Sequence, residues 1–334
     1  MLQVLLSPPI LVPLIFPGFL TATDVLLFII WFERKLTAKV QLRYGPFYVF
    51  KPLGGVVQMF ADLLKFTFAE VIVPKNADRK TFLFSPILLF TLSLLPVIAI
   101  PMTMSNDFTV SFGNLSLVIV MALLTLTPTF ILLLGWSSDN KFSLIGSLRE
   151  GYMMMAYEIP MFISLLAMAV LYNSLDLGKI AELQANGLWG IILNPLASIA
   201  LFWTILMTTA RFPFDITEAE SEIVIGPYTE YSGVLFVLCM GAPYIKLYVL
   251  SLLYAVVFLG GWNPLVWPLT TFPLLPGLLV LLKGVIIMGL CVFMRSIYPR
   301  YRIDQALRLG WHKLVVLSLL SVCLSLLLVG LGVI

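Results

Sequence analysis

Eight apolar runs, each long enough to cross a lipid bilayer, leave this chain few folds to adopt. A membrane-spanning helix needs about 20 mostly apolar residues. The runs lie near 10–32, 81–102, 115–136, 152–173, 189–210, 231–258, 276–297 and 311–334. The chain is 60% hydrophobic and only 11% charged, whereas a soluble domain carries about 25% charged residues. The sequence therefore predicts an all-α integral membrane protein, with about eight transmembrane helices in a single membrane domain over 1–334.

The basic residues predict how these helices are oriented. Most of the 20 lysines and arginines fall in the connections after the first, third, fifth and seventh runs. Cytoplasmic loops of membrane proteins carry such an excess, so we expect these connections in the cytoplasm and both termini on the outer side. The start of the chain lacks a basic segment followed by a small-residue cleavage site, which favours reading the first run as a span. Short basic loops between spans do not indicate nucleic-acid binding.

Cysteine and histidine are too few to hold a redox centre. Cys239, Cys291 and Cys323 lie far apart inside apolar runs, and His312 is the single histidine. An iron–sulfur cluster, a zinc site or an axially ligated haem needs more ligands than these. We therefore expect the chain to bind no metal or redox cofactor by itself.

The long connection after the first span contains an amphipathic helix near 55–70. Gln58, Asp62 and Lys65 are spaced four and three apart, and apolar side chains occupy the other face. This pattern is typical of a helix that lies in the membrane interface, where it would line the mouth of a lipid-accessible cavity. Arg43 ends a cationic stripe earlier in the same connection, and lipid headgroups and a protein partner remain alternative ligands for that stripe.

An acidic segment over 211–230 is the least expected feature of so apolar a chain. Its five carboxylates, accompanied by the one cation Arg211, are Asp215, Glu218, Glu220, Glu222 and Glu230. Charge beside hydrocarbon is costly and is kept mainly where it pairs, meets water or carries protons and ions. The segment is therefore the first candidate for a functional site.

The spacing in this segment predicts a local structure. Asp215 can cap a helix whose third residue is Glu218, which would place Glu218 and Glu222 on one face. Like charges one turn apart repel, so one of them would bind a proton more readily and exchange it under working conditions. A salt-bridged loop that docks onto a neighbouring subunit is the alternative.

Ionisable side chains inside the apolar runs are further candidates. Asp24 interrupts the first run, Glu158 precedes Pro160 in the fourth, and Lys246 and Lys283 lie in the sixth and seventh. An intramembrane charge is a functional candidate by default, although a lysine can also extend its ammonium group to the interface.

Several motifs together resemble the NADH dehydrogenase subunit 1 family, the membrane subunit at the heel of respiratory complex I. The matching segments are Glu33-Arg-Lys, Arg43-Tyr-Gly-Pro46, Tyr157-Glu-Ile159, Arg211-Phe-Pro-Phe-Asp-Ile-Thr-Glu-Ala-Glu-Ser-Glu222, Thr229-Glu-Tyr-Ser232 and Tyr298-Pro-Arg-Tyr-Arg-Ile-Asp-Gln305. The likeness runs nearly end to end. It implies an eight-helix subunit that docks beneath the peripheral redox arm, forms the floor of a quinone cavity and couples electron transfer to proton or ion translocation.

The resemblance also implies roles for individual residues, none of them catalytic or metal-binding. The proton or coupling path would contain Glu158, Glu218, Glu220, Glu222 and Asp24. The cavity loop would contain Arg211, Asp215 and Glu230, and the interface with the redox arm Arg34, Arg43, Arg300 and Arg302. The redox arm on the cytoplasmic side would contain subunits with iron–sulfur clusters and a subunit like the hydrogenase large subunit. Other membrane-arm subunits and lipids would complete the surroundings, in a bacterial or archaeal cell membrane more than in an organellar inner membrane.

Departures from the family pattern leave the electron acceptor open. Ile216-Thr217, Ile225-Gly-Pro-Tyr228 and Phe47-Tyr-Val-Phe-Lys51 replace more usual residues around the cavity and the interfacial helix. One alternative is the same role in a ferredoxin-dependent membrane-bound hydrogenase or sulfur-reducing complex without quinone, coupled to H⁺ or Na⁺ transport. A free-standing carrier or a structural anchor is another, which the absence of an inverted repeat disfavours.

Overall fold

The structure is a computed structural model that describes residues 8–103, 113–185, 187–264 and 274–332, without the side chains of residues 8–10, 53 and 220. The last two residues of the predicted final span, 333 and 334, lie outside this description. Every regular element in the described ranges is helical. The prediction of an all-α integral membrane protein is confirmed.

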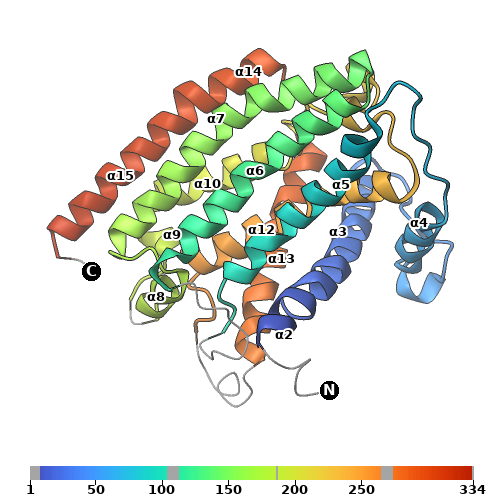
Figure 1. Cartoon of the computed structure of the whole chain (residues 1–334). Coiled ribbons are helices and arrows are strands. Elements are labelled where there is room, and N and C mark those ends of the chain that lie inside the picture. Colours follow the sequence, from blue (N-terminus) through green and yellow to red (C-terminus); the bar gives the residue numbers. More distant parts are fainter. Residues whose placement is uncertain (1–7, 104–112, 186, 265–273, 333–334) are drawn as a thin grey trace.

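The helices form one bundle whose members run roughly side by side (Figure 1). Those longer than one turn are α2 (Pro8–Leu14), α3 (Phe19–Val40), α4 (Val57–Thr67), α5 (Arg79–Leu94), α6 (Ser116–Ser137), α7 (Lys141–Leu171), α8 (Leu177–Leu183), α10 (Pro195–Thr208), α12 (Gly233–Phe258), α13 (Leu275–Ile297), α14 (Ile303–Arg308) and α15 (Val315–Gly330). The short turns α9 (Gly190–Leu193) and α11 (Glu220–Ile223) precede α10 and α12. In the described ranges, seven helical segments are long and apolar enough to cross a membrane, and α10 is a shorter apolar helix.

Asn194 explains why the fifth apolar run is broken. Its side-chain oxygen accepts a hydrogen bond from the Ala197 backbone N–H at 3.0 Å and so caps the start of α10. Its amide nitrogen donates to the Ser321 carbonyl and the Ser325 hydroxyl, both at 2.9 Å. A buried amide needs all of these partners in hydrocarbon, and the cap therefore also fixes α15 against α10.

Helix α12 forms the centre of the bundle. All of its residues from 245 to 258 are buried, and it packs on α5, α13, α3 and α10. A helix that is apolar on all sides is stable only when other helices surround it. The fold thus places Lys246, the one charged residue of this helix, in the interior.

Helix α15 shows the opposite arrangement, with an exposed apolar outer face. Ser318, Ser321 and Ser325 are buried, whereas Leu320 and Leu327 on the other side are exposed. Small residues let transmembrane helices approach closely, and α15 uses them to pack on α7 and α10. The exposed leucines give α15 the apolar outer face expected of a helix that spans a bilayer.

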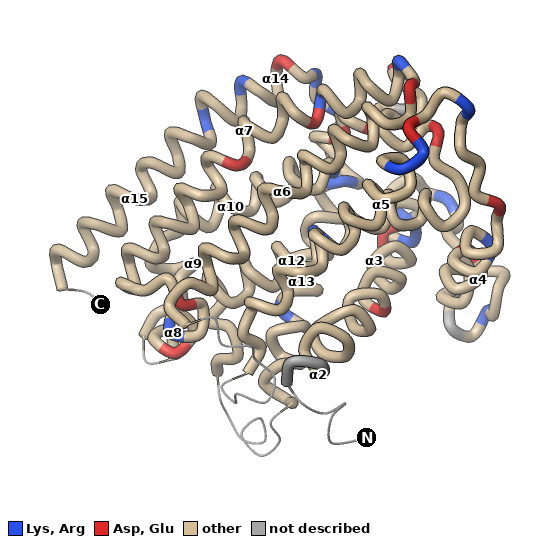
Figure 2. Tube along the Cα trace, viewed as in Figure 1, with Lys and Arg blue, Asp and Glu red and all other residues tan. Residues whose placement is uncertain are grey.

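Charged residues gather at one end of the bundle, near α14, α4 and the start of α7 (Figure 2). The body of the bundle is almost free of them, and α2, α8 and the end of α15 lie at the opposite end (Figures 1 and 2). Helix α7 begins at Lys141, capped by the Asn140 side chain, and not near residue 152. Arg149 and Glu150, which the sequence reading assigned to a loop, are therefore helical.

Two glycines hold the acidic segment against α7. Gly226 has φ +57°, and a Cβ there would lie 2.0 Å from the Thr217 carbonyl oxygen. A Cβ on Gly146 would lie 2.7 Å from the Gly226 Cα. Only glycine permits this approach of the segment to the helix and to itself.

Gly226→Ala is therefore expected to destabilise the protein more than Gly113→Ala. Both glycines have a positive φ, of +57° and +62°, but nothing lies within 4 Å of a Cβ at Gly113. The left-handed conformation costs each alanine about 1–2 kcal/mol, and the clash adds about 1–3 kcal/mol at position 226 alone. Thermal unfolding of the detergent-solubilised protein measures the difference, and equal shifts in Tm would contradict the packing described here.

Candidate functional site

A buried ion cluster joins three separate parts of the chain at the charged end. Glu33 near the end of α3 forms ion pairs with Arg211, just after α10, and with Arg295 near the end of α13. Glu33 and Arg211 are both buried. The Tyr244 hydroxyl donates to Glu33 at 3.4 Å, and the Arg211 guanidinium lies 4.0 Å from the centre of the Tyr244 ring. The cluster fixes the start of the acidic segment relative to α3, α12 and α13.

Asp215 forms the next ion pair, with Arg300 at 2.8 Å. The Arg300 guanidinium also lies 5.1 Å from the centre of the Phe212 ring. The prediction that Asp215 caps a helix is wrong, because α11 begins at Glu220 with Ala219 as its cap residue. The Asp215 carboxylate instead binds a cation from the connection between α13 and α14.

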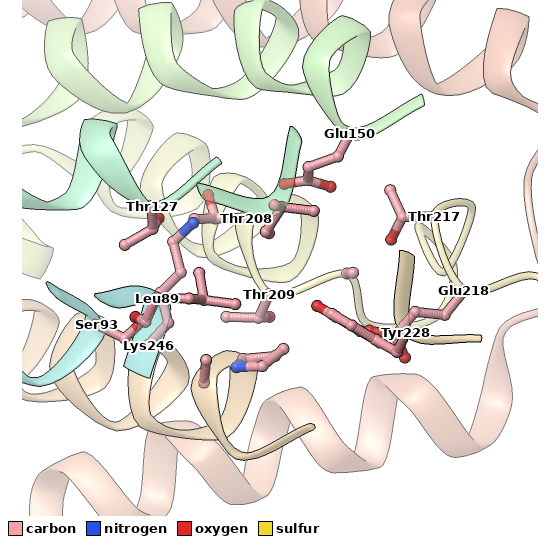
Figure 3. Close-up of a pocket in the computed structure, with 14 residues that line it drawn as sticks. Leu89, Ser93, Thr127, Glu150, Thr208, Thr209, Thr217, Glu218, Tyr228 and Lys246 are labelled. Atoms are coloured by element: carbon pink, nitrogen blue, oxygen red, sulfur yellow. The ribbon is translucent and has the colours of Figure 1, made fainter. Parts of the chain in front are cut away.

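The acidic segment also lines a small cavity of about 20 Å³. Its wall comes from five long helices and from the acidic segment (Figure 3). The polar lining residues are Ser93, Thr127, Glu150, Thr208, Thr209, Thr217, Glu218, Tyr228 and Lys246. A cavity holds a water molecule once its volume exceeds about 10–15 Å³ and two or more polar groups face it. This cavity meets both conditions.

Helix α7 contributes a carboxylate that the sequence reading did not select. Glu150 is buried and accepts a hydrogen bond of 2.9 Å from the buried Tyr157 hydroxyl. The two residues are seven apart and so lie on one face of α7. Glu158 follows on the same helix, is buried, and interacts electrostatically with Glu150 and with Lys246 of α12. The seven-residue spacing of Glu150 and Tyr157 could have indicated this contact, but the predicted span began near residue 152 and left Glu150 outside the helix.

Lys246 faces these carboxylates from α12. It is 4% exposed, and among the described residues its ammonium nitrogen has no hydrogen-bond partner. Its Nζ lies 5.7 Å from the centre of the Tyr157 ring. The Glu150 and Glu158 carboxylates both interact electrostatically with the ammonium group. Figure 3 shows Lys246 and Ser93 at one end of the cavity and Glu218 and Tyr228 at the other.

Tyr228 of the acidic segment lines the same cavity as Glu150 and Lys246. Burial raises the pKa of the Tyr228 hydroxyl well above its usual value, and the Glu218 and Glu150 carboxylates raise it further. The hydroxyl therefore stays protonated and can donate a hydrogen bond toward either carboxylate.

Glu222 and Asp24, predicted for the coupling path, and Glu230, predicted for the cavity loop, lie away from the cavity. Glu222 is exposed and pairs with Arg149 of α7 at 2.5 Å, so it does not share a helical face with Glu218. Asp24 is exposed on the outward side of α3. The side chain of Glu220 lies outside the description. Glu230 accepts a 2.5 Å hydrogen bond from Asn140 and faces a separate open groove beside Pro74 and Lys141.

The arginines predicted for the redox-arm interface lie at the charged end. Arg300 and Arg302, with Arg149, line an open hollow of about 230 Å³. Arg34 forms an ion pair of 2.8 Å with Asp62 of α4. Desolvation acts to raise the pKa of Asp62, but hydrogen bonds from Arg34 and Gln58 outweigh it and leave this pKa below its usual value. The Arg43 side chain donates a hydrogen bond to the nearby Gln41 side chain.

Lys283 has a structural role that the sequence did not reveal. Its ammonium group donates to the carbonyl oxygens of Leu259, Gly261 and Asn263 at 2.6, 2.8 and 2.5 Å. A cation at the carboxyl end of a helix satisfies carbonyls that have no partner within the helix. Lys283 thus caps the end of α12, far along the bundle from the cavity.

Fold and site together define a class: an integral membrane helix bundle that encloses paired and unpaired charges and gathers its remaining charges at one end. The family model described as NADH dehydrogenase matches residues 14–326. The chain belongs to this NADH dehydrogenase family.

Named relatives come from archaea and bacteria, and each is one subunit of a larger dehydrogenase. The relative from the F(420)H(2) dehydrogenase of Methanosarcina acetivorans is 36% identical over 313 residues, covering 91% of this chain and 88% of the relative. The relative from the NADH-quinone oxidoreductase of a Geobacillus strain is 35% identical over 291 residues, 87% of this chain and 85% of the relative. A relative from an NADH-quinone oxidoreductase of Rhizobium meliloti is 34% identical over 302 residues, 88% of this chain and 90% of the relative.

Glu33→Ala is expected to destabilise the protein by about 3–5 kcal/mol, because it leaves two arginines without their buried counter-charge. The matched control is Glu222→Ala, which breaks an ion pair whose glutamate side chain is 54% exposed and should cost less than about 1 kcal/mol. Thermal unfolding of the two variants decides the matter. Similar Tm values for both would show that the Glu33 cluster adds nothing beyond a surface ion pair.

Proposed function

We propose that this chain is the membrane-arm subunit of an ion-translocating respiratory oxidoreductase of the complex I type. In this role it docks the peripheral redox arm, forms the floor of a quinone-type cavity and couples electron transfer to proton translocation. It carries no catalytic metal, and the iron–sulfur clusters belong to its partners. In the described residues, no group of three His, Cys, Asp or Glu side chains could hold a metal ion.

The observation that carries the proposal is the run of charges that leads from the charged end into the bundle. Asp215 pairs with Arg300, Glu218 lines the cavity, and Glu158 is buried on α7 and interacts electrostatically with the cavity residues Glu150 and Lys246. Buried ionisable groups inside a membrane bundle are typical of proton relays. A change of charge at the acidic segment would therefore shift the protonation of ionisable groups deep in the membrane.

Apolar surface beside the charged end suits a quinone-type substrate. Helix α4 exposes Phe60, Leu64 and Phe66, and the neighbouring α3 exposes Phe28. Helix α4 packs on α3 and α12, so its free side is available to lipid and to a partner subunit. Two relatives are named as parts of quinone oxidoreductases and one as part of an F(420)H(2) dehydrogenase, which favours quinone over a hydrogenase-type or sulfur-reducing reaction.

The basic residues favour a cytoplasmic position for the charged end. Arg300 and Arg302 lie in the open hollow there, where they can bind acidic side chains of the peripheral arm. The excess of lysine and arginine in these connections likewise favours both chain ends on the outer side. Glu220, Glu222 and Asp24 stay predicted members of the coupling path.

Glu218→Gln and Glu158→Gln in the purified complex, reconstituted into vesicles, test the coupling role. We expect the number of protons moved per electron to fall by about tenfold or more, since a positioned carboxylate contributes about 10²-fold or more to proton transfer. Donor oxidation with an added protonophore should stay within about twofold of the unmodified complex, because in this proposal the iron–sulfur clusters that carry the electrons belong to the partner subunits. The two readouts are vesicle acidification and donor oxidation.

Glu182→Gln is the matched control, since this carboxylate lies on α8 at the other end of the bundle. Fully assembled Glu218→Gln and Glu158→Gln complexes that acidify vesicles at the normal ratio would refute the coupling role. The quinone assignment fails separately if quinone analogues leave donor oxidation unchanged while protons or sulfur compounds accept the electrons.

A further inference from the structure

We propose that Glu150 and Lys246 form a proton-transfer pair inside the membrane, which receives protons from Glu218 across the cavity and passes them to Glu158. The proposal rests on the coupling role proposed above and adds two residues to it. It depends on geometry: a carboxylate of α7 and an ammonium group of α12 face one small polar cavity whose far end is Glu218 (Figure 3).

Lys246 is the unusual member of this pair. An ammonium group has three donors and no acceptor, yet its nitrogen has no hydrogen-bond partner among the described residues and is buried. A structural lysine in the same bundle looks different, because Lys283 donates to three carbonyl oxygens. Lys246 therefore has free donors that face a cavity large enough for water.

The cavity wall supplies the acceptors that such water needs. The hydroxyls of Thr127, Thr208 and Thr209 donate to carbonyls of their own helices at 2.8, 2.6 and 2.7 Å. Their protons are thus committed, and their oxygens can only accept from the cavity side. A water molecule there would accept from Lys246 and donate to a threonine oxygen or to Glu150, which makes a continuous path for a proton.

Glu150 is held for this task by its partners. The Tyr157 hydroxyl donates to one oxygen at 2.9 Å, which orients the carboxylate without neutralising it. Lys246 shares the cavity wall with Glu150 and interacts electrostatically with both Glu150 and Glu158. A buried ion pair adds little stability by comparison with apolar side chains of the same size, so stability alone gives little reason for this pair.

One cycle balances its protons. A proton from Glu218 crosses the cavity by way of water to the Glu150 carboxylate, and Glu150 becomes neutral. Lys246 then lacks its counter-charge and gives a proton to the Glu158 carboxylate. The neutral amine takes the proton back from Glu150, which restores the charges of both groups. The net result is one proton moved from Glu218 to Glu158.

The test compares Glu150→Gln, Lys246→Met and the double variant in the complete complex, reconstituted into vesicles. Each single variant leaves a buried charge unpaired and can impair assembly, whereas the double variant removes both charges. We expect the assembled double variant to oxidise donor normally with protonophore present but to move about tenfold fewer protons per electron. We expect Lys246→Arg, which keeps the charge but cannot release its proton, to assemble and to remain equally uncoupled.

Thr208→Val/Thr209→Val tests the water path without touching a charge. It removes two acceptors from the cavity wall while nearly keeping side-chain size, and we expect proton transfer to slow while donor oxidation with protonophore stays unchanged. Lys179→Met is the control for loss of a lysine, since Lys179 is exposed and bonds Asn114 at the far end. Its proton ratio should equal that of the unmodified complex.

The outcomes separate this inference from the proposed function. If Glu218→Gln uncouples the complex but the double variant and Lys246→Arg pump normally, the pair is structural and this inference is overturned. If Glu218→Gln itself pumps normally, the proposed function fails first. Normal proton transfer in Thr208→Val/Thr209→Val overturns the water path.

Discussion

The ion pairs of Glu33 with Arg211 and Arg295 are the interaction on which the rest of the site depends. A charge in a membrane bundle is tolerated when it finds a partner nearby, and here one carboxylate serves two cations from distant parts of the sequence. Arg211 is the first residue of the acidic segment, so the pair sets where that segment leaves the membrane. From this point Asp215 reaches Arg300 and Glu218 reaches the cavity.

Much of the fold could be predicted from hydropathy, since apolar runs of about 20 residues have little choice but to form spans. The amphipathic pattern around Asp62 likewise predicted an interfacial helix, and α4 occupies Val57–Thr67. Helix ends were harder to place. Helix α7 begins after its cap residue Asn140, among polar residues that hydropathy assigns to a loop. Asn194 caps α10 in the middle of a run whose hydropathy predicts one continuous helix.

The candidate site was predicted in part, because sequence reveals which charges exist but not which of them meet. Glu158 and Glu218 were selected for their surroundings in the sequence; Glu218 lines the cavity, and Glu158 is buried and interacts electrostatically with Glu150 and Lys246. Glu150 lies outside the predicted span 152–173 and was not among the predicted site residues. Its seven-residue spacing from Tyr157 places both on one helical face only once the helix begins at Lys141. The sequence could not show that Lys283 has carbonyl partners and Lys246 has none among the described residues. The difference depends on whether carbonyl oxygens at the end of another helix lie within hydrogen-bond distance.

The two sets of buried charge differ in what they allow. Around Glu33, two arginines and the Tyr244 hydroxyl converge on one carboxylate and an aromatic ring lies against Arg211, so the carboxylate is fixed in place. Around Lys246, the ammonium donors have no partner among the described residues, and the threonine hydroxyls and Glu150 line the same cavity. An arginine does not release its proton, whereas a buried lysine can, so Lys246 can take part in proton transfer and the arginines around Glu33 cannot. The Glu33 cluster holds the acidic segment so that Glu218 lines the cavity. Glu150 and Lys246 line the same cavity, so a change of charge on Glu218 alters their protonation.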